Sequence, residues 1–157
     1  MNKALDCVNC IVGRFTNRGG LYNCTNCTAE ATSTEGATYC SKCNAGTFMN
    51  ATKNCETCPS GKVSTFGKDN CTACEAGFYT SFDQSTCKSC GAGKFSNRSL
   101  QTSSDTCLDC KEGQYSSAIG VSSESLCNKC QPGKFSTLVP NEESCTECPA
   151  GQLAAEE

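Results

Sequence analysis

The sequence predicts a small disulfide-rich repeat fold: an elongated rod of short, irregular β-hairpins with little or no helix. The chain of 157 residues holds 18 cysteines, a fraction typical of disulfide or metal scaffolds. Leu, Ile, Val and Phe together number only 21, too few to fill an ordinary core, so cross-links must supply much of the stability. All of the cysteines also fall into Cys-x-x-Cys pairs at nearly regular intervals.

The nine Cys-x-x-Cys pairs define the repeats. The pairs begin at residues 7, 24, 40, 55, 71, 87, 107, 127 and 145. We therefore expect residues 1–157 to be one tandem array of about eight repeats, with boundaries near these positions. The N-terminus lacks the apolar segment of a signal peptide, although disulfides persist mainly in oxidising compartments. The array is therefore expected to be a fragment of a longer secreted chain.

Each repeat carries a common sequence motif, which we call the phrase, and this motif predicts the local structure of the repeat. In most repeats a glycine follows the second cysteine by three positions, an aromatic residue by five and a serine or threonine by six. The glycine predicts a turn with positive φ, the next residues a strand, and the polar stretch after them a loop. One hairpin, with its aromatic residue covering a disulfide, should result. The second repeat, "CTNCTAEATSTEGATYC", has Glu30 and Thr32 at the glycine and aromatic positions and should be the least regular.

A Cys-x-x-Cys pair has three interpretations. A redox site needs a low-pKa thiol at a helix N-terminus, and no segment has helical periodicity. Pairs of Cys-x-x-Cys separated by 11 to 16 residues also fit Cys₄ zinc sites, but nine pairs cannot be grouped by fours and the spacing is too uniform. We therefore favour structural disulfides, with no metal and no cofactor, and keep a Cys₄ zinc-binding protein as the third hypothesis.

Two disulfide schemes are compatible with the spacing. The local scheme joins the second cysteine of each pair to the first cysteine of the next pair, and loops of different length are tolerated because closure entropy grows slowly. It gives Cys10–Cys24, Cys27–Cys40, Cys43–Cys55, Cys58–Cys71, Cys74–Cys87, Cys90–Cys107, Cys110–Cys127 and Cys130–Cys145. The alternative interlocks neighbouring pairs, first to third and second to fourth. The local scheme leaves Cys7 and Cys148 for a disulfide between chains or outside the fragment.

The stretch "CNKCQPGKFSTLVPNEESCTEC" resembles the ephrin-receptor-like cysteine-rich repeat, and it is similar to the first half-module of the tumour-necrosis-factor-receptor cysteine-rich domain. In that half-module, the cysteine before "xxGxY/F" pairs with the first cysteine of the following pair, so the resemblance supports the local scheme. Long pure tandems of the phrase look most like large protist surface proteins. The resemblance implies a stalk, coat or fibril component. The second half-module of the receptors is absent.

Several function classes are excluded or disfavoured by composition. A pI near 5.0 and scattered Lys and Arg offer no basic surface for nucleic acid, and no apolar run is long enough to cross a bilayer. Without His, a Ser or Cys nucleophile lacks its usual base, so no enzyme and no catalytic residue is expected. Five sequons are candidate N-glycosylation sites. They are Asn50 and Asn97, which we rank first, and Asn23, Asn26 and Asn70, where Cys is the middle residue.

Together these features predict an extracellular or cell-surface structural protein, a disulfide-stapled rod that spaces, coats or self-associates end to end with neighbouring copies. The alternative is a receptor-like ectodomain or adhesion module that binds a protein or glycan.

Overall fold

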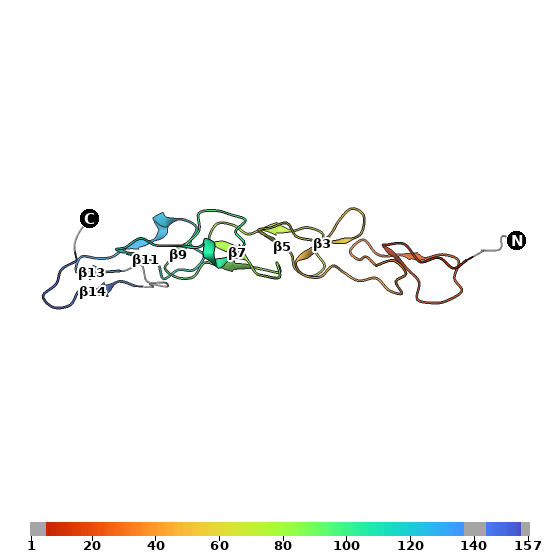
Figure 1. The fold of residues 1–157 in the computed structure, drawn as a ribbon, viewed down its shortest axis with the longest axis horizontal. Helices are drawn as coiled ribbons and strands as arrows, with labels where there is room; N and C mark the ends of the chain where they lie inside the picture. Colours follow the sequence, from red (N-terminus) through yellow and green to blue (C-terminus); the bar gives the residue numbers. More distant parts are fainter. Residues whose placement is uncertain (1–5, 137–143, 155–157) are drawn as a thin grey trace. The chain divides into compact units, whose positions relative to one another are not determined.

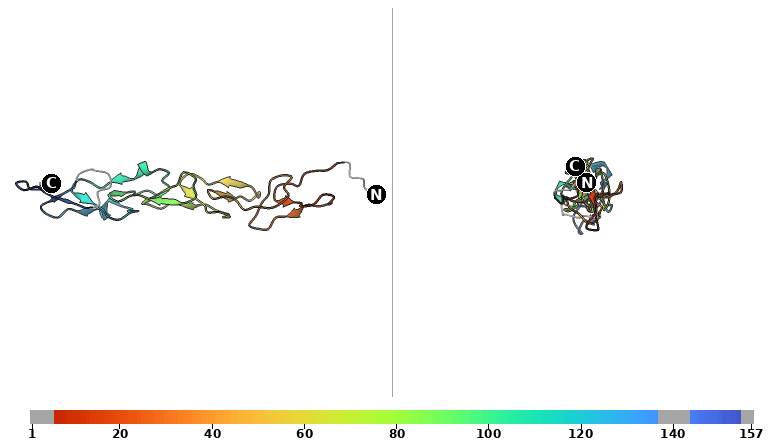
Figure 2. Two further views of the ribbon diagram at one scale, coloured as in Figure 1. Left: turned by 90° about the horizontal axis from the view of Figure 1, so that it is seen from below. Right: turned by 90° about the vertical axis from the view of Figure 1, so that its right-hand side faces the viewer.

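The computed structural model describes residues 6–136 and 144–154. The chain divides into two compact units, one within Met1–Pro59 and Val63–Thr72, the other within Ser60–Lys62 and Ala73–Glu157. Figure 1 shows that each consists of short strand pairs joined by loops. In the second unit the strand pairs from β7–β8 to β13–β14 follow one another in chain order, and the left-hand view of Figure 2 agrees.

Within the described residues, the strands pair as seven two-stranded sheets. They are β1 (Arg14–Phe15), β2 (Thr25–Asn26), β3 (Thr47–Met49), β4 (Cys55–Thr57), β5 (Lys62–Val63), β6 (Thr72–Ala73), β7 (Phe78–Thr80), β8 (Cys87–Ser89), β9 (Lys94–Phe95), β10 (Leu108–Asp109), β11 (Gln114–Tyr115), β12 (Asn128–Lys129), β13 (Lys134–Phe135) and β14 (Thr146–Glu147). Two 3₁₀ turns, η1 (Ser104–Thr106) and η2 (Glu124–Leu126), are the helical segments of the described residues. The predicted fold of small disulfide-bonded hairpins with little or no helix is confirmed.

We name each repeat by its opening cysteine, the second of a Cys-x-x-Cys pair. In the Cys90 repeat, Lys94 N donates to Gly91 O, and Gly93 between them has φ +71°. This turn sends β9 antiparallel to β10, with Lys94 opposite Asp109, and Cys110 N closes the hairpin on Gly93 O at 2.8 Å. The predicted positive φ is therefore present at this turn. Glycine suits the position because residues that have a side chain rarely adopt positive φ. In each named strand pair, the two residues between the paired cysteines lie in the return strand.

The structure joins the cysteines in the local scheme. The eight disulfides are Cys10–Cys24, Cys27–Cys40, Cys43–Cys55, Cys58–Cys71, Cys74–Cys87, Cys90–Cys107, Cys110–Cys127 and Cys130–Cys145. Their Cα atoms lie 5.5 to 6.0 Å apart, the ordinary separation for a disulfide. Each disulfide closes one repeat, and none encloses another.

Disulfides also make up most of the buried apolar interior. The largest fully buried side chains include Cys74 and Cys90. Phe95 of the Cys90 repeat is buried in a cluster with Cys110, Cys127 and Val121, so this aromatic residue packs at the disulfide of the following repeat. The other phrase aromatics are half-buried or exposed. The core is therefore small, as the scarcity of aliphatic residues predicts.

The Cys27 repeat is the least regular, as predicted. Between β2 and β3 the described chain forms one isolated bridge, Thr32 with Ser41, in place of a named strand pair. The turn itself remains, since Ala31 N donates to Thr28 O at 3.2 Å, but Glu30 in place of the glycine does not adopt the positive φ of the other repeats.

Candidate functional site

Successive repeats are joined by a recurring backbone interface, which is the candidate functional site of a repeat protein. The phrase glycine of one repeat donates its N–H to the carbonyl of the serine that follows the aromatic position in the next repeat. The pairs are Gly13–Ser33, Gly46–Ser64, Gly77–Ser96, Gly93–Ser116 and Gly113–Ser136, with N–O distances of 2.8 to 3.3 Å. Each pair lies within one compact unit. The contact uses main-chain atoms, so it can recur while side chains vary.

A second backbone bond runs in the opposite direction. An amide in the loop of the next repeat donates to the carbonyl of the opening cysteine before it. The pairs are Gly36–Cys10, Gly67–Cys43, Leu100–Cys74 and Gly120–Cys90, at 2.8 to 2.9 Å. All four donors have positive φ. Sequence reasoning missed this contact, although a glycine nine or ten residues after the opening cysteine in three of these loops is a usable signal.

The phrase serine adds a side-chain bond at three of these interfaces. The hydroxyls of Ser33, Ser64 and Ser136 donate to the carbonyls of Arg14, Thr47 and Gln114 of the preceding repeat, at 2.7 to 2.8 Å. These serines are 4 to 6% exposed. The recurring serine of the phrase therefore has a physical role, because its loss would remove a hydrogen bond that joins two repeats.

We expect Ser64→Ala to weaken the interface between the Cys43 and Cys58 repeats by about 1 kcal/mol, the usual net contribution of such a bond. The measurement is hydrogen exchange of the Gly46 amide, which donates to Ser64 O. Its protection should fall about five- to tenfold. Thr65→Ala, a neighbouring exposed hydroxyl, is the control and should leave the exchange unchanged. Equal effects of the two variants would contradict the assigned bond.

Lys53 holds the irregular Cys27 repeat. The Lys53 ammonium donates a hydrogen bond to Ala29 O at 3.0 Å, and the main-chain carbonyl of Lys53 accepts a hydrogen bond from the Thr32 hydroxyl. Its Cβ and Cγ lie over Gly13, where an added Cβ would come within 3.3 to 3.5 Å of them. Lys53 adopts φ +63°, an unusual conformation for a residue with a side chain. One side chain thus reaches two preceding repeats.

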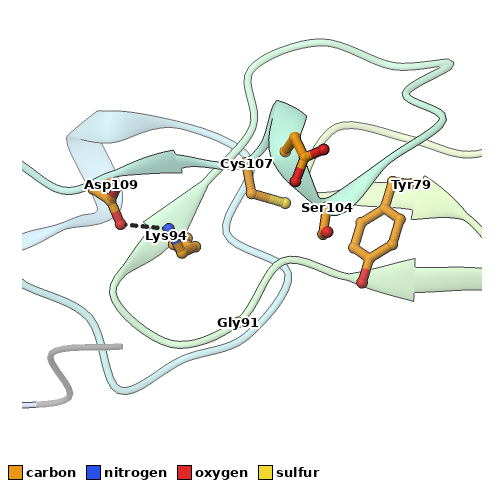
Figure 3. Close-up of a pocket in the computed structure, with 7 residues that line it drawn as sticks. Tyr79, Gly91, Lys94, Ser104, Cys107 and Asp109 are labelled. Carbon is orange, nitrogen blue, oxygen red and sulfur yellow. Dashed lines mark hydrogen bonds and ion pairs between the residues drawn. The ribbon is translucent and has the colours of Figure 1, made fainter. Parts of the chain in front are cut away.

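A hollow in the second compact unit lies beside the Cys90–Cys107 disulfide. Its volume is about 530 Å³, and it is open and mostly polar. Figure 3 shows Tyr79 on one side, the ion pair of Lys94 with Asp109 on the other, and Ser104 between them. The Lys94 Nζ–Asp109 Oδ1 distance is 2.6 Å. Asp105 completes the polar rim and accepts from the Ser103 hydroxyl.

The turn of the Cys74 repeat is fixed by a carboxylate. Asp83 Oδ1 accepts from the hydroxyls of Ser81 and Ser85 at 2.6 and 2.8 Å, and from the Ser85 amide at 3.1 Å. These bonds, that of Ser81 foremost, lower the pKa of Asp83 to about 2. The turn presents Phe82 fully exposed.

The stability contributed by the Asp83 turn should therefore depend on pH. Because the folded pKa is depressed, the contribution is present above the unfolded pKa of about 3.9 and is lost as the pH falls through about 2. NMR titration of the Asp83 carboxyl carbon should give a midpoint near 2 in the folded protein, and Ser81→Ala should raise it. A folded-state midpoint near 3.9 would contradict the hydrogen-bonded turn.

The remaining predicted residues are not brought together. Cys7 is free and exposed, and Cys148 is free and half-buried. Four sequon asparagines, Asn23, Asn26, Asn70 and Asn97, are exposed. Asn50 is half-buried, and its side-chain oxygen accepts from the Thr52 amide and hydroxyl and from the Asn54 amide. Occupancy of the sequons stays a prediction.

Sixteen cysteines are in disulfides and offer no thiolate to a metal. Within residues 6–136 and 144–154, no three His, Cys, Asp or Glu side chains are grouped to hold a metal ion. No helix in that part of the chain is long and apolar enough to span a membrane. Eight disulfides in a chain of this size are typical of an oxidising, extracellular environment. The chain is thus a cysteine-rich, disulfide-bonded module of a kind typical of that environment.

Comparison with known proteins adds no family. No protein-family model matches the chain, and no curated protein matches it either. The resemblance to ephrin-receptor-like and tumour-necrosis-factor-receptor-like repeats therefore stays a prediction.

Proposed function

We propose that this chain is an extracellular structural protein, a spacer in a cell-surface stalk, coat or filament, without catalytic activity. The recurring backbone interface carries the proposal. Four repeats, two in each compact unit, offer both a glycine amide and a cysteine carbonyl to the repeat that follows; they open at Cys10, Cys43, Cys74 and Cys90. Such an interface is heterologous, so it can be extended by further copies without closing.

Two further observations support a structural role. The buried interior is made mainly of disulfides, which suit a protein that must persist outside the cell. Cys7 and Cys148 are free, and we propose that they form disulfides with neighbouring copies or with further repeats. N-glycans on the exposed sequon asparagines would coat such a structure.

The test is self-association of the secreted protein. The chain should be expressed behind a secretory leader and examined by analytical ultracentrifugation and negative-stain electron microscopy. We expect reducible multimers that grow with concentration, and we expect Cys7→Ser/Cys148→Ser to form only reversible ones. A wild-type protein that stays monomeric at all concentrations and carries no surface label on intact producing cells would contradict the structural role.

The hollow beside Cys107 favours a second candidate, a receptor-like or adhesion module that binds a glycan. Tyr79 supplies an aromatic face, while Lys94, Asp105 and Asp109 supply hydrogen-bonding groups, the mixture found in many polar ligand sites. A glycan array of the secreted protein tests this function, with Tyr79→Ala as the matched variant. Binding that the variant abolishes would favour recognition over a purely structural role.

A further inference from the structure

The disulfides form a continuous covalent route along the chain. From Cys10 to Cys145 the route crosses each of the eight disulfides in turn, and between successive disulfides it passes through only the two residues of a Cys-x-x-Cys pair. This follows from the serial connectivity, in which every loop is closed before the next one begins.

The links of this route are already extended. Six of its seven Cys-x-x-Cys segments contain residues of a β-strand, namely β2, β4, β6, β8, β10 and β12, and the seventh contains Ser41, which forms a bridge. A strand is close to the maximum length of a peptide. The disulfides hold Cα atoms 5.5 to 6.0 Å apart. Each link can therefore lengthen only slightly when the chain is pulled.

The other residues that shape a repeat are not part of this covalent route. The phrase glycine, the aromatic residue, the serine and the loop amides that join repeats all lie inside loops closed by a disulfide, for example between Cys90 and Cys107. The closed loops differ in length, with sequence separations from 12 to 17. Because the disulfide spans the loop, its length does not change the route.

We propose that the chain is a tension-bearing tether of fixed maximum length, in which the covalent route carries force and the loops do not. This proposal rests on the proposed structural function and names the mechanical property behind it. With its disulfides intact, the segment from Cys10 to Cys145 can extend to about 120 Å, whereas the same segment without disulfides would reach about 460 Å. Loops that are shielded from force can keep their fold, their glycans and their binding surfaces while the chain is pulled.

Single-molecule optical tweezers test the proposal on the full chain, held by peptide tags added beyond both ends. The oxidised protein should lengthen no further than about 120 Å between Cys10 and Cys145. On addition of dithiothreitol, each disulfide takes up two electrons and two protons, and the reductant closes to its cyclic disulfide. The length should then increase by about 340 Å in total, in eight steps of about 35 to 52 Å that follow the loop lengths.

A matched pair of variants sharpens the result. Cys58→Ala/Cys71→Ala should add about 38 Å to the oxidised chain, the length of one released loop of 13 residue steps. Cys7→Ser/Cys148→Ser should add nothing, because neither residue is on the route. The reduction series on the wild-type chain tests the same point if the first variant does not fold.

An oxidised chain that lengthens well beyond about 120 Å would overturn the proposal. The interlocked disulfide scheme would give that result. In that scheme no disulfide spans the loop between one interlocked group of four cysteines and the next, so each such loop could add about 40 Å. One isolated molecule is pulled, so this outcome is independent of whether chains self-associate. Failure of the tether and failure of the proposed assembly are thus told apart.

Discussion

Gly77→Ala should destabilise the second compact unit by about 2 to 5 kcal/mol. Gly77 is buried and has φ +87°, a conformation that costs a residue with a Cβ about 1–2 kcal/mol. An added Cβ would also lie 2.2 Å from the Gly120 carbonyl oxygen, and relief of such overpacking costs about 1–3 kcal/mol more. The Cys110 repeat that supplies Gly120 is two repeats further along the chain, so the damage should spread beyond one hairpin. Urea unfolding with the disulfides intact measures the loss.

Gly113→Ala separates the two causes. Gly113 occupies the same position in its own repeat and has φ +73°, but an added Cβ at that site would meet no neighbouring atom within 4 Å. Its variant should therefore lose only the conformational part, about 1–2 kcal/mol. If both variants lost the same stability, the close approach of Gly120 to Gly77 would be wrong.

Removal of one internal disulfide should have an effect of similar size. For Cys74→Ala/Cys87→Ala we expect a loss of about 3 kcal/mol, because the disulfide closes a loop of 13 residue steps and restricts the unfolded chain accordingly. Cys74 is fully buried, so the replaced sulfur also leaves a small cavity. The loss should appear in urea unfolding and as a lower yield of secreted protein.

The control for this variant is Cys7→Ser/Cys148→Ser. These two cysteines are free, so the stability of the monomer should change by less than about 0.5 kcal/mol. A control as unstable as the Cys74→Ala/Cys87→Ala protein would mean that the end cysteines are paired within the chain.

The sequence is a good guide to the interior of each repeat. The cysteine spacing and the phrase glycine indicate where each hairpin begins, and Glu30 marks the repeat that departs from the pattern. The strands are nevertheless only two or three residues long, because a disulfide and a tight turn already hold the two chain segments together. Short strands leave little alternation of polar and apolar residues to read.

The contacts between repeats are much harder to predict. They are formed by main-chain amides and carbonyls, which every residue other than proline carries and which leave no side-chain pattern. Gly36, Gly67 and Gly120 give a hint, since glycine favours positive φ. Leu100 makes the same bond with φ +62°, however, and its identity predicts the opposite conformation. The polar hollow also depends on residues from separate repeats that only the fold brings together.

The most direct test of the serial disulfide scheme is a disulfide map of the secreted protein. The non-reduced chain should be digested with pepsin at acidic pH, where disulfides do not exchange, and the linked peptides identified by mass spectrometry. We predict eight linked pairs, each joining the second cysteine of one Cys-x-x-Cys to the first of the next. Links such as Cys7–Cys24 with Cys10–Cys27, or free thiols accompanied by bound zinc, would contradict the scheme.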